Sequence, residues 1–203
     1  MAIIPIPAKF GFTKLPSFKL QRASNILRSK YTGQGQVVVF PYAVWMLQGN
    51  LVEYDGLDAG RVRSFLVQLD GQKNTFRLPV PGFSRPMTGY VGNALANGAA
   101  AARAMSMAID GLPANTAIVA EGDYFTVNDE LKLVTQAGAS NVAGQMVINF
   151  KPPLRKAVAD NTAITFQNPT CLMRAADDDV ANWAVAAPIR QQGNFNAVEA
   201  VDI

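Results

Sequence analysis

Two groups of carboxylates come closest, by residue type and spacing, to a chemical site in this sequence. Asp177, Asp178 and Asp179 are consecutive, and carboxylate oxygens bind divalent cations. They lack the spaced ligands and the glycine of an EF-hand loop, and consecutive side chains diverge on any regular backbone. We therefore interpret this run as a solvated acidic turn before a predicted strand around Trp183.

The second group is Glu121 and Asp123, which flank Gly122. Paired carboxylates hydrolyse glycosides when they are held about 5–10 Å apart and one pKa is raised. Adjacency in sequence does not provide that geometry. A turn at Gly122-Asp123, with Tyr124 and Phe125 beginning a half-buried strand, explains the pattern better. We therefore assign no catalytic residue, no cofactor-binding residue and no metal ligand, and we expect no cofactor and no enzymatic activity.

Cationic and aromatic residues alternate near the start of the chain, a pattern that can bind single-stranded nucleic acid. Much of the alternation has the period of a strand, so a half-buried strand with one solvated face is the favoured interpretation. The short basic turn Lys151–Lys156 is too brief to be a polybasic address. The residues concerned near the start are Lys9, Phe10, Phe12, Lys14, Phe18, Lys19, Arg22, Arg28, Lys30 and Tyr31.

The chain has no His and one Cys, Cys171. This excludes Ser-His-Asp and Cys-His catalysis, His-ligated zinc, and Zn or iron–sulfur sites that need paired Cys. Gly33 and Gly35 lack the Lys and the strand–loop–helix context of a phosphate loop. The unpaired Cys171 is typical of a reducing cytosol or of a small buried hydrophobic residue.

The composition is poor in charge. Of 203 residues, 49% are hydrophobic and 16% are charged, against about 25% charged in ordinary globular proteins. This argues against intrinsic disorder. It indicates either a surface partly covered by neighbouring subunits or a β protein with a surface of small residues. The length fits one or two domains with a core that needs no disulfide or metal.

The net charge of +3 hides an asymmetry. Residues 1–85 contain 11 Lys/Arg and 4 Asp/Glu, a net +7, and residues 86–203 contain 7 and 11, a net −4. A basic half and an acidic half fit either a nucleic-acid contact or subunits that stack with opposite potentials. Two solvated faces of different charge would explain the same numbers.

The first half of the chain is predicted to be mainly β. Ser17–Arg22 alternates apolar and polar residues, Thr32–Gly35 is a turn, and Gln36–Phe40 is a Val-rich strand that ends at an edge or bend marked by Pro41. Val44–Tyr54 is a second long strand, with a bulge or turn at Gly49-Asn50.

One helix is predicted near residues 58–70. Asp58 is its expected N-cap, and Asp70-Gly71 its stop signal. The helical spacing of Val62, Phe65, Leu66 and Leu69 predicts an apolar stripe packed on a sheet, with Arg61, Ser64 and Gln68 off that stripe. Strand Thr75–Val80 follows, and then the Pro/Gly-rich segment 79–86, which is the predicted domain boundary. The predicted domains are 1–83 and 88–203.

The second half is predicted to be a series of short strands with turns between them, which suggests a small sandwich or barrel. Ala94–Met107 has helical propensity, but its glycine favours a loop followed by a strand. The predicted strands are Ala104–Ile109, Tyr124–Val127, Leu131–Gln136, Gln145–Phe150, Ala163–Gln167, Leu172–Ala175, Trp183–Ala187 and Phe195–Val201.

No targeting or membrane segment is expected. The N-terminus MAIIPIPAKFGF lacks the basic start and apolar core of a signal peptide. No run reaches the roughly 18–20 apolar residues of a membrane span.

The order of several segments resembles a family of tailed-bacteriophage tail-tip proteins, the distal tail or baseplate ring proteins. The resemblance extends over residues 36–203 and combines a short helix, a Gly-containing turn, a "TF-L" strand, and then the pieces of a second domain. The segments are Ser64–Leu66, Gly71–Leu78, Leu112–Asn115, Val119, Gly122–Phe125, Leu131–Val134, Val147–Ala157, Asp160, Ala163-Ile164, Asn168-Pro169, Asn182-Trp183, Phe195 and Val198–Ala200.

The resemblance implies a mainly β fold: a tail-tube-like β-sandwich with one flanking helix, followed by a small accessory β-barrel or sandwich domain. It implies a structural virion component that assembles in the host bacterial cytoplasm into a closed, sixfold ring. Its partners would be other copies of itself and the neighbouring tail-tube and tail-tip proteins, with DNA only in transit through the lumen. Under this interpretation the basic first half faces subunit contacts or the exterior and does not line the lumen.

Three other functions remain open. A tail-tube, terminator or adaptor role would use the same fold. A small β-barrel with basic and aromatic strands could instead bind carbohydrate or single-stranded nucleic acid. A carboxylate hydrolase would depend on Glu121 or Asp123.

Overall fold

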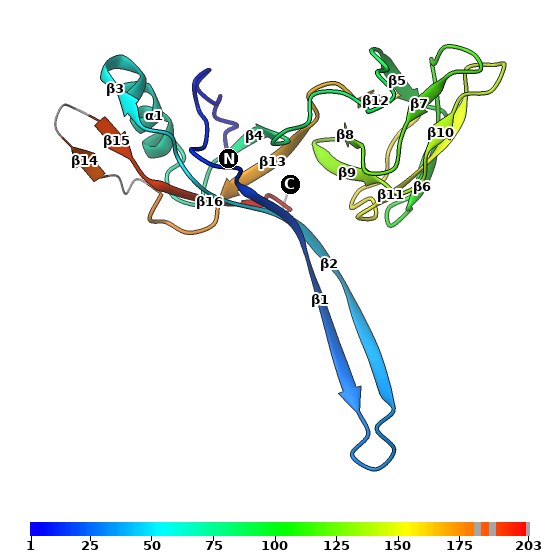
Figure 1. Ribbon diagram of the computed structural model, residues 1–203. Coiled ribbons are helices and arrows are strands. Elements are labelled where there is room, and N and C mark those ends of the chain that lie inside the picture. The colour runs from blue at the N-terminus through cyan, green and yellow to red at the C-terminus, as the bar shows by residue number, and fades with distance from the viewer. Residues whose placement is uncertain (181–183, 187–189, 202–203) are drawn as a thin grey trace. The chain divides into compact units, whose positions relative to one another are not determined.

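The computed structural model describes residues 1–180, 184–186 and 190–201, and the chain in it is mainly β with one helix. Figure 1 gives the order of the elements. They are β1 Ser17–Arg28, β2 Gly35–Asn50, β3 Tyr54–Asp55, α1 Gly56–Gln68, β4 Thr75–Pro79, β5 Asn93–Ala96, β6 Ser106–Asp110, β7 Ala117–Val119, β8 Tyr124–Val127, β9 Glu130–Val134, β10 Gly138–Ala139, β11 Met146–Lys151, β12 Ala163–Thr165, β13 Thr170–Ala175, β14 Ala184–Ala186, β15 Arg190–Gln192 and β16 Asn194–Glu199.

The chain divides into two compact units. The barrel unit comprises Met1–Ile6 and Asn74–Met173, and the arm unit comprises Pro7–Lys73 and Arg174–Ile203. The predicted domains, 1–83 and 88–203, therefore differ from the units, because the last thirty residues belong with the first part of the chain. The cause is a long-range pairing: β16 lies antiparallel against β2, with Phe195 opposite Gly49.

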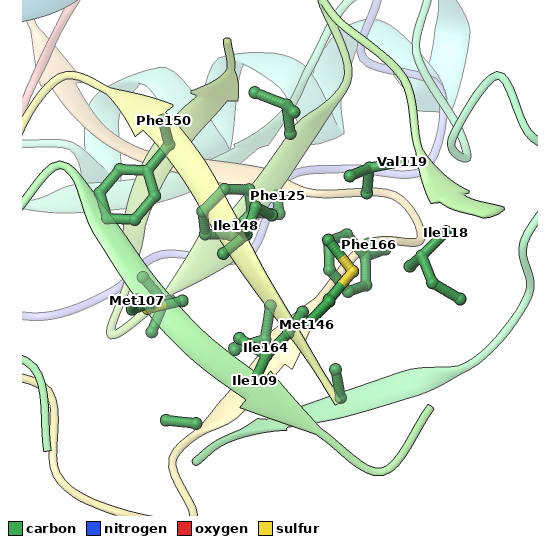
Figure 2. Close-up of a cluster of buried hydrophobic side chains, with 14 of the residues drawn as sticks. Met107, Ile109, Ile118, Val119, Phe125, Met146, Ile148, Phe150, Ile164 and Phe166 are labelled. Carbon is green, nitrogen blue, oxygen red and sulfur yellow. The ribbon is translucent and has the colours of Figure 1, made fainter. Parts of the chain in front are cut away.

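A closed barrel with the strand order β11-β6-β5-β12-β8-β9 forms the centre of the barrel unit. Alternate residues of its short strands point inward, as the period of a strand requires. Figure 2 shows these side chains gathered in one core, where Phe125 lies edge-on to Phe150 at 5.4 Å between ring centroids. The predicted barrel is confirmed in this unit, whereas the sandwich remains a prediction.

The segment Asn93–Ala108 departs from its predicted structure only at its beginning. Asn93–Ala96 is strand β5 of the barrel, and Ala94 and Ala96 are buried in the core. A loop and then β6 follow, as predicted, so the helical alternative is wrong. Alanine has little strand propensity, but its small side chain fits the crowded interior of a small barrel.

In the arm unit, β1, β2 and β16 form an antiparallel sheet in that order, and β14, β15 and β3 form a second one. The predicted stripe of α1 is confirmed: Val62, Phe65 and Leu66 are buried, as is Leu69 just after the helix. The ring of Phe10 packs edge-on against Phe65 and Phe195, at 5.3 and 5.4 Å between centroids. This aromatic cluster joins the N-terminal segment, the helix and β16 in one core.

Both ends of α1 follow from local chemistry, but the predicted N-cap is wrong. The helix begins at Gly56 with Asp55 as N-cap, and Asp58 lies inside the first turn. There Asp58 accepts hydrogen bonds from Lys9 Nζ at 2.6 Å and from Arg61 Nη1 at 3.2 Å, so its carboxylate serves ion pairs and does not cap the helix. The predicted stop is confirmed, because Asp70 and Gly71 both have positive φ.

Gly49-Asn50 is neither a turn nor a bulge, because both residues continue β2. A Cβ at Gly49 would lie 2.7 Å from the Phe12 ring, so the glycine lets that ring approach the sheet. The strand predicted at Trp183–Ala187 lies partly outside the described residues, and its described part is β14. The Asn182-Trp183 segment of the resemblance also lies outside them.

Candidate functional site

The two carboxylate groups have structural roles. Asp178 Oδ1 accepts the backbone N–H of Gln72 at 3.1 Å, and Asp177 Oδ1 accepts that of Asp179 at 3.1 Å. A Cβ at Gly71 would collide with the Asp178 carboxylate, so this glycine fits the acidic turn closely against the end of α1. Among the described residues, no group of three or more acidic or Cys side chains is placed to hold a metal ion.

Glu121 and Asp123 do not act as a pair. Asp123 is fully buried, and its two carboxylate oxygens accept the backbone N–H groups of Met87 at 3.0 Å and Ala120 at 2.7 Å. Glu121 is exposed at the surface of the same turn. The Asp123 carboxylate therefore holds the backbone at Met87 and the backbone at Ala120 together. This agrees with the turn predicted at Gly122-Asp123.

Replacing Asp123 should therefore destabilise the barrel unit. We expect Asp123→Ala to lower the free energy of unfolding by about 2–4 kcal/mol, because two partly buried N–H groups lose their acceptors. The exposed neighbour Glu121 provides the matched control, since Glu121→Ala should change the free energy of unfolding by less than about 0.5 kcal/mol. Urea unfolding followed by circular dichroism measures both. Equal effects of the two variants would contradict the assigned role of Asp123.

The basic and aromatic residues near the start of the chain are mostly structural too. Phe10 and Phe12 belong to the aromatic cluster, and Phe18 stacks on Trp45 with the ring planes 2° apart. The Tyr54 hydroxyl accepts the N–H of Gly11 at 2.8 Å and donates to its carbonyl at 3.1 Å. Burial raises the pKa of Tyr54, although the hydrogen bond that its oxygen accepts from the Gly11 N–H opposes that shift.

The raised pKa of Tyr54 predicts a pH-dependent effect. A hydroxyl whose folded pKa lies above its unfolded value of about 10 stabilises the fold below that value. The stabilisation is lost as the pH rises through the folded pKa. We expect Tyr54→Phe to cost about 1–2 kcal/mol at pH 8, from the hydrogen bonds it removes, and less at pH 11. Urea unfolding followed by tryptophan fluorescence at both pH values checks this.

The control for that experiment is Tyr31→Phe, because the Tyr31 side chain is 98% exposed. It should leave stability unchanged at both pH values. A deficit of Tyr54→Phe that stayed constant between pH 8 and pH 11 would show that the phenol titrates alike in the folded and unfolded chain, and one that grew would show that its folded pKa is lowered; either result contradicts the prediction.

The surface that these roles leave unexplained is the outer part of the β1–β2 hairpin. The two strands run side by side away from the rest of the arm unit (Figure 1). Their register shifts between Arg22 and Ser24, where residues 40–42 lie opposite residue 23, at the bend predicted at Pro41. We call residues 23–40, beyond this shift, the arm. Its pairs run from Ser24–Val39 to Arg28–Gly35.

The arm exposes an unusual amount of apolar surface. Its two strands carry apolar side chains on both faces, because Ile26 and Val37 lie opposite each other on one face and Leu27 and Val38 lie on the other. Each is between 38% and 66% exposed, and none is covered by another described element of the arm unit. The exposed apolar side chains of the strands are Ile26, Leu27, Val37, Val38, Val39 and Phe40.

The edges of the arm are open as well. β1 is the terminal strand of its sheet, and β2 pairs with β16 only over Met46–Asn50. In the part of the chain that the structure describes, both outer edges of the arm therefore lack a neighbouring strand. Long open edges with apolar side chains drive association, and natural proteins cover them. An isolated two-stranded hairpin is also only marginally stable in water.

The charge of the arm is of one sign. Arg28 and Lys30 lie at its tip and Arg22 lies just before it, while no Asp or Glu precedes Glu53 in the chain. The arm is thus a cationic, apolar, two-stranded projection. Such a surface can hold a partner by edge pairing and apolar contact, with attraction for acidic groups.

A second, smaller feature is a polar hollow on the sheet of the arm unit. Amide side chains from β2 and β16 line it, and no hydrogen bond to them occurs within the described residues. Its lining also includes Lys14, Leu15 and Ser17. The amides are those of Gln48, Asn50, Asn194 and Asn196.

A scan against protein-family models and a search of curated proteins each returned no match to this chain. No helix within the described residues is long and apolar enough to cross a membrane.

Proposed function

We propose that this protein is a structural virion component of a tailed bacteriophage, a ring-forming distal tail or tail-tip protein. It joins the tail tube to the tip or baseplate and leaves a channel through which DNA passes. The observation that carries the proposal is the arm, whose open edges and apolar faces suit contact between subunits. The order of segments, which resembles that of the tail-tip family, supports the proposal that the assembly is a ring of the phage tail.

The energies of the arm contact favour a ring over a simple dimer. Full burial of an aliphatic or aromatic side chain contributes about 1.5–3 kcal/mol. Six half-exposed side chains therefore contribute roughly 5–8 kcal/mol if the arm is covered. Association itself costs about 4–15 kcal/mol, so a single arm contact yields a weak complex. In a closed ring each subunit both gives and receives an arm, so the number of contacts per subunit is twice that of a dimer held by one arm.

The charge pattern supports the same proposal. Six of the eleven cations of residues 1–85 lie from Lys9 to Lys30, on the arm and the segment before it, where no Asp or Glu accompanies them. In a ring joined through arms, these cations lie at subunit contacts and not along the lumen, where they would retain DNA phosphates. A tail-tube, terminator or adaptor protein would use the same contacts and remains the alternative within this class.

The experiment is a mass measurement of the purified protein over a range of concentrations, with electron microscopy of the larger species. We expect rings, formed alone or on purified tail partners, and labelling of the tail tip when an antibody to the protein is added to virions. A strict monomer that neither assembles on tail partners nor occurs in virions would overturn the proposal.

A carbohydrate-binding module is the second candidate, favoured by the amide-lined hollow. Amide groups donate and accept hydrogen bonds in equal number, as sugar hydroxyls do. Titration with neutral oligosaccharides distinguishes it: Asn194→Ala with Asn196→Ala should abolish binding by the module but should not affect ring assembly.

A further inference from the structure

We propose that the arm of one copy docks on the outer face of α1 in a second copy. The inference rests on the proposed function, because it requires that the chain assembles with itself. It adds the surface that receives the arm, and thereby the direction in which subunits join. Three observations on the arm unit carry it: the distribution of charge, the surface of the helix, and the consequence of pairing two arms.

The exposed carboxylates of the arm unit lie away from the arm and near α1. Asp70 follows the helix directly, and the acidic turn 177–179 is held there by the hydrogen bond from Gln72 to Asp178. One lysine, Lys73, pairs with Asp70 at 2.6 Å. The helix C-terminus adds its own partial negative charge. This end of α1 is therefore acidic, and it complements the Arg28 and Lys30 cations at the tip of the arm.

The outer face of α1 is open and exposes two apolar side chains, beside Arg61, which is paired with Asp58, and Gln68, which donates a hydrogen bond to Ser64. Leu57 and Val67 are 71% and 60% exposed. Gly60 and Ser64 lie between them, at spacings that place all four on one side of the helix. The buried stripe of Val62, Phe65 and Leu66 occupies the opposite side. Two exposed hydrophobic residues with two small ones between them form a shallow surface of the kind that a strand can cover.

No described residue of the chain explains Gly60. A Cβ at this position would meet nothing within 4 Å, whereas a Cβ at Gly49 or Gly71 would strike Phe12 or Asp178. Glycine in a helix interior is less favourable than alanine. Its conformation does not require glycine either, because Gly60 is helical and has no positive φ. A backbone that approaches from outside would account for the missing side chain.

Pairing two arms with each other is the competing arrangement. It would join the Arg28 and Lys30 cations of two copies in one sheet that has no carboxylate from either arm to balance them, and like charges repel. An arm on a helix is instead a contact between two different surfaces, so every subunit keeps one arm to give and one helix to offer. Such contacts propagate until a ring closes.

Disulfide mapping tests the docking directly. Val39→Cys places a thiol at the base of the arm and Leu57→Cys places one at the start of α1, the end away from the acidic turn, at two exposed positions. Cys171 is buried and stays in place. Under mild oxidation, a mixture of the two variants should yield a mixed dimer linked through both sites. Val142→Cys, an exposed valine outside the arm unit, is the matched control and should link to Val39→Cys at least tenfold less.

Each other outcome overturns the inference in a distinguishable way. A dimer formed by Val39→Cys alone would show that arms pair with arms. Oligomers without the mixed disulfide would place the receiving surface elsewhere, and the proposed function would still stand. A protein that stays monomeric would remove the inference, and antibody labelling of virions would then decide the function separately.

Charge exchange gives an independent readout. Arg28→Glu with Lys30→Glu should weaken association at least tenfold, and so should Asp177→Lys with Asp179→Lys. A mixture of the two double variants should recover pairwise association, because the charges are opposite again. Gly60→Gln should weaken association at least tenfold without lowering the thermal stability of the subunit. If the mixture failed to recover, or Gly60→Gln had no effect on association, docking on α1 would be wrong.

Discussion

A chain without its arm should fold normally and fail to assemble. Ser24 and Val39 are directly opposite each other, so residues 25–38 can be replaced by Asn-Gly, the sequence favoured in two-residue hairpin turns. We expect self-association to fall by more than 100-fold, which corresponds to about 2.7 kcal/mol. Unfolding of the remainder should be unchanged, because the removed side chains bury little surface within the arm unit. Sedimentation and circular dichroism measure the two quantities.

Point variants provide the control for this deletion. Val37→Thr with Val39→Thr keeps the shape and strand propensity of the arm but removes apolar surface, so association should fall by a smaller factor. The same change at Val142, which is 79% exposed on another surface, should leave association unchanged. If the shortened chain assembled as well as the full one, the arm would have no role in subunit contact.

The sequence predicted most of the elements but not the arm. Val37, Val38, Val39 and Phe40 form a continuous apolar run, which on pattern alone indicates a strand with both faces buried. The strand exists, but in the arm unit it is uncovered. Periodicity reports which residues avoid water and not whether the covering surface belongs to the same chain. The signal that could have identified the arm was the absence of any Asp or Glu before Glu53.

Local sequence patterns could not predict the division of the chain into two units either. The Pro/Gly-rich segment 79–86 marks a real break in regular structure between β4 and β5. The pairing of β16 with β2, however, joins residues about 150 positions apart, and the cost of closing so long a loop depends weakly on its length. Nothing local distinguishes a strand that returns to the first sheet from one that continues the barrel. The turn at Asp70-Gly71 was predicted because positive φ leaves a signature in residue type.

A buried ion pair should be the most sensitive site of the barrel unit. Lys132 is fully buried, and its Nζ donates to Glu130 Oε2 at 2.6 Å and to the Pro153 carbonyl at 2.8 Å. The Glu130 carboxylate also accepts the backbone N–H groups of Arg155 at 3.0 Å and Lys156 at 3.1 Å. One carboxylate thus holds the turn after β11 and balances a buried ammonium. The predicted basic turn Lys151–Lys156 is part of this cluster.

Removing Glu130 leaves the buried charge of Lys132 without a counter-ion. We expect Glu130→Ala to destabilise the barrel unit by about 3–5 kcal/mol, because a buried ammonium loses its counter-ion. Amide hydrogen exchange of β8 and β9 is the suitable measurement, because it reports on opening of the barrel strands themselves. Protection there should fall by about 100- to 1,000-fold or more, at 1.4 kcal/mol for each factor of ten.

The double variant separates the charge from the hydrogen bonds. Glu130→Gln with Lys132→Met removes both charges but keeps an acceptor for the N–H groups of Arg155 and Lys156, so it should recover most of the loss. Lys151→Met, the same substitution at an exposed lysine of β11, should leave exchange unchanged. If the double variant were as unstable as Glu130→Ala, the acceptor geometry of the carboxylate, and not the buried charge, would be what holds the turn. If Glu130→Ala exchanged like the native chain, water would have to reach Lys132, and its burial in the fold would be wrong.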